Sequence, residues 1–112
     1  MDNRKTFNKL VRDRIPEIIE SNGEISEIEI LDDLTYTKML YEKLFEECNE
    51  FLNADDKSKV EEMADVLEVL YAIADTLGVT IQDVENVRLE KQEKRGAFKK
   101  RILLKSTSKK DE

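Results

Sequence analysis

Apolar residues recur every three or four positions through the middle of the chain, a spacing typical of amphipathic helices. This pattern predicts one helix over residues 32–53 and a second over residues 58–77. Ser58 is the expected N-cap of the second helix, and Gly78 is expected to end it. Because the intervening turn at residues 54–56 is short, the two helices are expected to form an antiparallel hairpin.

Shorter patterns predict one more helix on each side of this hairpin. The amino-terminal helix has Asp13 as its expected N-cap and residues 21–23, Ser-Asn-Gly, as its end. The carboxy-terminal helix spans residues 80–96 and begins with a capping box formed by Thr80 and Asp83. The chain is therefore expected to contain four helices.

Three stretches lack a helical pattern. Residues 1–7 are expected to form a loose or extended arm, and residues 105–112 a disordered tail with nothing to bury. Residues 25–31 alternate weakly between apolar and polar, which leaves open an extended connector or one short strand. With only 3 glycines and 1 proline, a β-sandwich or barrel is disfavoured. The pattern predicts one all-α domain at residues 1–104, followed by the tail.

Charge is unevenly distributed along this chain of 112 residues, whose net charge is -7. Residues 1–16 carry five basic and two acidic side chains, and residues 88–112 carry ten basic and four acidic ones. Residues 17–87 carry four basic and twenty acidic side chains. The acidic balance argues against nucleic acid as a partner, and the absence of a long apolar run argues against a membrane partner. The single cysteine, Cys48, fits a reducing cytoplasm.

Carboxylates interrupt the faces that these two helices should bury. At roughly 100° per residue, Glu47 falls on the same stripe as Leu40, Leu44 and Phe51, with Glu50 on its shoulder. Glu46, by contrast, is expected to point away from that stripe. Phe45 and Tyr71 are interpreted as core residues, with a place in the pocket as the alternative. Cys48 is interpreted as a small buried residue rather than a nucleophile, because no basic partner is evident.

The second helix of the hairpin is apolar on nearly every side, which predicts a central position and a second subunit to cover it. Glu62 and Asp65 lie at the edge of its buried side, three residues apart like Glu47 and Glu50. Carboxylates near a core are costly unless they are neutralised. Because the chain has no histidine, oxygen ligands of this kind predict Mg²⁺ or Mn²⁺ rather than zinc. The alternative is that the acids are merely a solvated face.

Basic residues near the two ends would complement such a site. Lys9 and Arg12 on the amino-terminal segment, and Lys94 and Arg95 at the end of the last helix, are candidates for binding a polyphosphate. The alternative for the first pair is a solvated helix entry. The alternative for the second pair is a cationic helix end stabilised by the helix dipole. Phe98 is either a core residue or a stacking surface for a base.

Four stretches together resemble a known family. They are the two acidic motifs at residues 46–50 (EECNE) and 62–65 (EMAD), the segment NKLVRDRIP at residues 8–16, and KQEKRGAF at residues 91–98. The chain resembles the all-α NTP pyrophosphatase (MazG-like) superfamily, in its phosphoribosyl-ATP pyrophosphohydrolase-like branch. The likeness covers about residues 7–104. An asparagine found further along the second acidic helix in some MazG enzymes is absent from residues 66–74.

The resemblance implies a four-helix bundle-type protomer that assembles into a homodimer or a dimer of dimers. It implies cleavage of a nucleoside triphosphate to the monophosphate and pyrophosphate with Mg²⁺, in house-cleaning of non-standard nucleotides. Phosphoribosyl-ATP in histidine biosynthesis is the alternative substrate, and a non-catalytic nucleotide-binding module is the alternative function. The family's metal ligands match Glu47, Glu50, Glu62 and Asp65. Glu46 and Glu47 are the expected catalytic residues, with Glu46 as the base that orients water.

Overall fold

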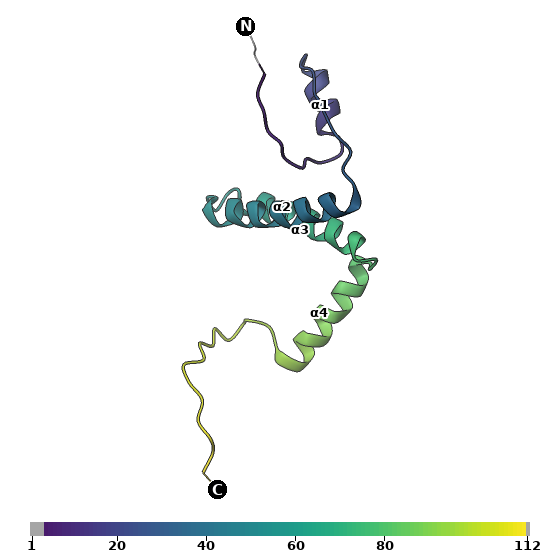
Figure 1. Cartoon of the computed structure of the whole chain (residues 1–112). Helices are drawn as coiled ribbons and strands as arrows, with labels where there is room; N and C mark the ends of the chain where they lie inside the picture. The colour runs from purple at the N-terminus through teal and green to yellow at the C-terminus, as the bar shows by residue number, and fades with distance from the viewer. Residues whose placement is uncertain (1–3, 112) are drawn as a thin grey trace. The chain divides into compact units, whose positions relative to one another are not determined.

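The computed structural model of the chain describes residues 4–111 (Figure 1). Residues 1–3 of the expected arm and residue 112 of the expected tail lie outside the described residues. Residues 4–111 form four helices and no strand, so the all-α class is confirmed. The helices are α1 Ile15–Ser21, α2 Asp33–Asn53, α3 Lys59–Thr76 and α4 Ile81–Arg95.

The chain divides into two units, Met1–Val79 and Thr80–Glu112. The first unit contains α1, α2 and α3, and the second contains α4 and the segment that follows it. In neither unit does a helix of the described residues combine the length and the apolar character needed to cross a membrane.

The two long helices of the first unit form the predicted hairpin. Helix α2 begins after Asp32, whose side chain accepts a hydrogen bond of 2.8 Å from the backbone N–H of Thr35. Leu40, early in α2, packs against Val69 and Ile73, late in α3. This pairing of early with late residues shows that α2 and α3 are antiparallel, and their ribbons overlap in Figure 1.

The turn between α2 and α3 is held by side chains on both sides. Lys59 Nζ donates a hydrogen bond of 2.7 Å to the backbone carbonyl of Phe51 and lies 4.7 Å from the centre of its ring. Ser58 is the N-cap residue, as predicted, but its side chain makes no capping hydrogen bond. Instead, Asp55 Oδ1 accepts a hydrogen bond of 3.0 Å from the backbone N–H of Ser58.

Helix α1 begins one residue later than the sequence predicts. Asp13 is not its N-cap, because the cap position is taken by Arg14 without a side-chain hydrogen bond. A backbone hydrogen bond of 3.0 Å from Ile15 N–H to the Arg12 carbonyl makes a turn there instead. Pro16 then lies in the first helical turn, where its missing N–H has no partner to lose.

Segments 4–14 and 22–32 of the first unit contain no regular structure apart from turns. The connector alternative for residues 25–31 is therefore the one that the described residues adopt, without a strand. Ile25 and Ile30 leave 96% and 87% of their surface exposed. Unpaired alternating residues of this kind do not form a strand without a neighbouring strand to bond to.

The second unit begins with the predicted capping box. Thr80 Oγ1 accepts a hydrogen bond of 3.0 Å from Asp83 N–H, and Asp83 Oδ2 accepts one of 2.9 Å from Thr80 N–H. Helix α4 ends at Gly96, whose φ of 85° lies in the left-handed region that glycine adopts most readily. Residues 101–111 form neither helix nor strand and are exposed. Phe98, two residues after Gly96, is also exposed rather than a core residue.

Few apolar side chains are fully buried in this arrangement. Among the described residues, the buried hydrophobic side chains are Leu40, Val69, Ile73 and Ala74. The interpretation of Phe45, Tyr71 and Cys48 as core residues is wrong for the single chain, since all three are exposed. The hairpin therefore has a small core and a large apolar surface.

We expect Leu40→Ala to lower the free energy of unfolding by about 3 kcal/mol, because it removes the most buried apolar side chain of the hairpin. The matched control is Leu34→Ala on the same helix, where the side chain is 85% exposed and the change should stay within about 0.5 kcal/mol. Urea denaturation followed by circular dichroism measures both. Equal losses in the two variants would contradict this description of the core.

Candidate metal centre

Helix α2 places Glu47 on its buried face. The residue lies two turns after Leu40 and one turn before Phe51, as the spacing predicts, and only 7% of its surface is exposed. It is the one charged residue that is buried among those the structure describes. The inward position predicted for Glu47 is therefore confirmed.

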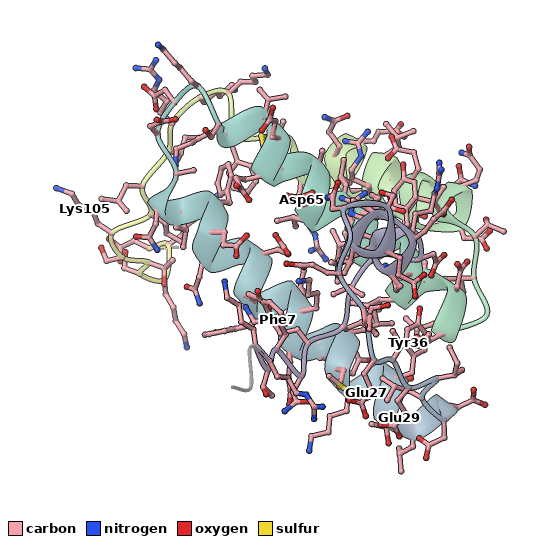
Figure 2. The ribbon with its side chains drawn as sticks, turned by 90° about the horizontal axis from the view of Figure 1, so that it is seen from above. Phe7, Glu27, Glu29, Tyr36, Asp65 and Lys105 are labelled. Atoms are coloured by element: carbon pink, nitrogen blue, oxygen red, sulfur yellow. The ribbon has the colours of Figure 1, made fainter. Side chains whose placement is uncertain are left out.

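Carboxylates from α2 and α3 gather around Glu47 in two overlapping sets. In the first set, one carboxylate oxygen from each of Glu46, Glu47 and Glu50 lies within 4.8 Å of the others. In the second set, the same holds for Glu47, Glu62 and Asp65, and Figure 2 labels Asp65 on α3. Glu47 belongs to both sets, so it links the acids of one helix to those of the other. We call these five residues the acid cluster.

One cation of the acid cluster comes from α2 itself. Lys43 Nζ lies 3.3 Å from Glu47 Oε1 and 3.7 Å from Glu46 Oε1. The sequence prediction missed Lys43, although its spacing of four residues from Glu47 is the one that brings side chains together on a helix. Its ammonium group partly neutralises the buried carboxylate.

Two more cations come from the amino-terminal segment, which passes over the acid cluster. Lys9 Nζ lies 3.2 Å from Glu46 Oε1, and Arg12 Nη2 lies 2.6 Å from Asp65 Oδ1. Lys9 thus contacts the predicted base Glu46, and Arg12 contacts the predicted metal ligand Asp65. Binding of polyphosphate by these two residues stays a prediction.

Glu46 does not point away from the site, as the sequence predicted, but is half-buried beneath Lys9. The helical wheel could not show this because the segment that covers Glu46 is far away in the sequence. Glu46 also lines a shallow pocket of ≈ 60 Å³ between residues 8–10 and α2, together with Lys9, Lys43 and Met39.

Two carboxylate oxygens of the acid cluster remain without a partner. Glu47 Oε2 and Glu62 Oε2 are buried, and no hydrogen bond reaches them from the described residues. A buried acceptor without a partner costs about 1–3 kcal/mol. The available cations therefore leave part of the buried negative charge uncompensated.

Burial also raises the pKa of Glu47 above its ordinary value. The hydrogen bond from Lys43 opposes this rise, and the negative charge of Glu50 adds to it. A carboxyl group whose pKa is raised by folding destabilises the folded chain when it ionises. The protonated carboxyl group therefore contributes to the stability of the fold below its ordinary pKa. This contribution is lost as the pH rises from the ordinary pKa through the raised one.

The donor set fits a hard divalent cation. Mg²⁺ and Mn²⁺ prefer carboxylate oxygens, and the acid cluster offers several of them within a few ångströms, including the two without a partner. A bound divalent cation would neutralise the negative charge of the acid cluster that Lys43 leaves uncompensated. The predicted ligands Glu47, Glu50, Glu62 and Asp65 all belong to this cluster, although Glu50 joins only the set on α2.

Lys94 and Arg95 lie in the last turn of α4, in the second unit. Lys94 Nζ is 3.0 Å from Glu90 Oε1, one turn back on the same helix. The basic end of a helix also interacts favourably with the helix dipole. A role for these two residues in binding polyphosphate stays a prediction.

We expect Glu47→Gln to raise the stability of the metal-free chain at neutral pH by about 1 kcal/mol, because it removes a buried charge with an unpaired oxygen. The gain should shrink toward pH 4, where Glu47 of the wild type takes up a proton and no longer destabilises the fold. Thermal unfolding in EDTA at several pH values measures this. A neutral-pH loss of stability in the variant would contradict the description of Glu47.

We expect Arg12→Gln to strengthen Mg²⁺ binding about threefold, because an exposed ion pair of this kind competes weakly with the cation for Asp65. Calorimetric titration of the nucleotide-free chain measures the change. Arg14→Gln is the matched control, since Arg14 pairs with Glu17 outside the acid cluster. Unchanged or weaker Mg²⁺ binding in Arg12→Gln would show that Arg12 does not compete with the metal.

Comparisons with protein-family models, with curated proteins and with solved structures find no match to this chain. The resemblance to MazG-like enzymes therefore rests on the motifs in the sequence. The case for a metal centre rests on the geometry of the acid cluster.

Proposed function

We propose that this chain is a Mg²⁺-dependent nucleoside triphosphate pyrophosphohydrolase, which cleaves a nucleoside triphosphate to the monophosphate and pyrophosphate. The observation that carries the proposal is the convergence of acids from α2 and α3 on the buried Glu47, with two carboxylate oxygens left unpaired. A merely solvated acidic face would expose these groups to water. Burying a carboxylate whose charge is only partly neutralised is energetically unfavourable. Unfavourable burial of this kind is common at functional sites.

The metal would be held by Glu47 and Glu50 from α2 and by Glu62 and Asp65 from α3. When bound, Mg²⁺ would neutralise phosphate oxygens and lower the pKa of a water molecule enough to make it a nucleophile near neutral pH. The chain's own contribution is to hold the acids close together. The rigid helices on both sides of Glu47 do this better than loops would.

The cations around the acid cluster would change partners when substrate binds. Lys9 and Arg12 lie on an irregular segment and pair with Glu46 and Asp65. A metal at the proposed ligands would release Arg12 from Asp65, and phosphate oxygens of the substrate would compete with Glu46 for Lys9. Glu46, freed from Lys9, would accept a proton from the attacking water. Lys94 and Arg95 are proposed as further contacts to the substrate.

The nature of the substrate is suggested by the sequence motifs. The resemblance to MazG-like enzymes favours nucleoside triphosphates, including non-standard or damaged ones. Phosphoribosyl-ATP carries the same polyphosphate chemistry and is the alternative within this reaction class. Attack at the α-phosphorus, with pyrophosphate as the leaving group, gives the same second product in both cases.

The test is a panel of standard and modified nucleoside triphosphates and phosphoribosyl-ATP, assayed for pyrophosphate and monophosphate with Mg²⁺ and with Mn²⁺. We expect at least one substrate to give both products, only when the divalent cation is present. Glu47→Gln should lower kcat by at least about 100-fold, because it weakens a ligand shared by both acid sets.

Glu68→Gln is the matched control, an exposed acid on α3 outside the acid cluster, and its kcat should equal that of the wild type. Turnover that survives Glu47→Gln, or that needs no divalent cation, would contradict the proposed site. Thermal stabilisation by a nucleotide without any product would identify a binding module instead of an enzyme.

A further inference from the structure

The connector at residues 25–31, between α1 and α2, has a backbone without partners. It forms neither helix nor strand, and Figure 1 draws it as an open segment between the two helices. None of its residues exchanges a backbone–backbone hydrogen bond with another of the residues that the structure describes. The N–H and C=O groups of the connector are therefore available to a neighbouring strand.

The side chains of the connector follow the alternation of a strand. In an extended chain successive side chains point to opposite faces. Ile28 and Ile30 therefore share one face. Glu27 and Glu29, both labelled in Figure 2, share the other. Isoleucine is among the residues that strands favour, and the length of the connector is close to that of an ordinary strand. The segment has the pattern of a strand without a sheet to join.

The isoleucines of the connector are left in water. Ile25, Ile28 and Ile30 leave 96%, 61% and 87% of their surface exposed. The connector also contains no glycine and no proline, the residues that mark most loops. Exposing large apolar side chains to water is unfavourable, so a partner that covers them would stabilise the extended segment.

Acidic residues surround these isoleucines. Residues 24–33 contain no basic residue and five acids, which are Glu24, Glu27, Glu29, Asp32 and Asp33. Carboxylates at this density repel nucleic acid and anionic lipid surfaces. They also disfavour pairing with the connector of a second copy, because like charges that face each other across two strands are destabilising. The charge therefore selects a partner strand with basic side chains.

Basic side chains are common at the open edges of β-sheets. Lysines placed there keep ordinary strands from adding to the edge. A strand with glutamates at matching positions neutralises these lysines. The feature that excludes other strands therefore favours this one.

We propose that residues 25–31 add as a strand to the lysine-bearing edge of a β-sheet in another protein. Backbone hydrogen bonds to the edge strand supply the affinity, as in other cases of strand addition. Ile28 and Ile30 lie on the apolar face of that sheet. Glu27 and Glu29 pair with the lysines on the opposite face. The proposal is independent of catalysis, because the connector contributes no residue to the acid cluster.

The first test adds a synthetic strand to the full chain. The probe is the peptide acetyl-Lys-Val-Lys-Val-Lys-Val-Lys-amide at up to about 5 mM, which covers the millimolar affinity of a short unstructured ligand. The readout is amide hydrogen exchange by NMR. We expect exchange of every second amide within residues 25–31 to slow about fivefold or more, the effect of one net hydrogen bond at each.

The matched control for this probe is the same peptide with D-valine in place of L-valine. It has the same charge and composition, but its alternating chirality prevents a regular strand beside an L-chain. We expect it to protect none of the amides of residues 25–31.

The second test exchanges charge. We expect the double variant Glu27→Lys, Glu29→Lys to lose about tenfold or more in affinity for the lysine peptide, and to be protected instead by the corresponding glutamate–valine peptide. The matched control is Glu61→Lys with Glu68→Lys, two exposed acids of α3 that change the net charge equally. Its affinity for the lysine peptide should stay within about threefold of the wild type, since distant charges are screened by salt. Circular dichroism should show wild-type unfolding for both variants.

The proposal is overturned by any of three results. Absence of protection at the highest concentration of the lysine peptide would show that the connector does not accept a strand. Equal protection by the D-valine peptide, or unchanged affinity in the Glu27→Lys, Glu29→Lys variant, would show binding by charge alone. Slow exchange of residues 25–31 without any peptide, slowing further as the protein concentration rises, would identify a second copy of the chain as the occupant.

Discussion

The arrangement of this hairpin depends on a carboxylate that is buried where an apolar side chain would be more stable. Glu47 occupies a position between Leu40 and Phe51 on the inward face of α2, and its pKa is raised by the loss of water around it. Lys43 compensates one of its oxygens, while the other has no partner among the described residues. The surrounding acids increase the free-energy cost of burying this charge, and a bound divalent cation would offset that cost.

Helices α2 and α3 present different kinds of side chain on their two sides. On one side, acids of α2 and α3 meet and are covered by cations from the amino-terminal segment. On the other side, large apolar side chains such as Phe45 of α2 and Leu67 of α3 are exposed. Between them lies a core of few buried residues, which is enough to align the helices but small for a chain of this length.

Local patterns predicted most of the helices and the position of Glu47. The ends of α2, the capping box of Thr80 and the end of α3 before Gly78 follow from side chains within a few residues of each other. The start of α1 did not, because a backbone turn replaced the expected cap at Asp13. Spacing along a helix was reliable where a neighbouring helix supplied the burial.

Contacts between distant segments were beyond the sequence argument. The helical wheel placed Glu46 outside the site, because nothing in the wheel indicates that Lys9 folds over it. Lys43 was overlooked among many charged residues, although its spacing from Glu47 identified it as a partner. Apolar periodicity predicts Phe45 and Cys48 as core residues, because it cannot distinguish a buried apolar stripe from an exposed one.

The most direct test of the central claim is anomalous X-ray diffraction from crystals of the chain soaked in Mn²⁺, measured at the manganese absorption edge. The account predicts a peak between α2 and α3, about 2 Å from carboxylate oxygens of Glu47 and of at least one acid on α3. Saturating Mn²⁺ without a peak at the acid cluster, or with peaks only at other acids of the surface, would contradict it.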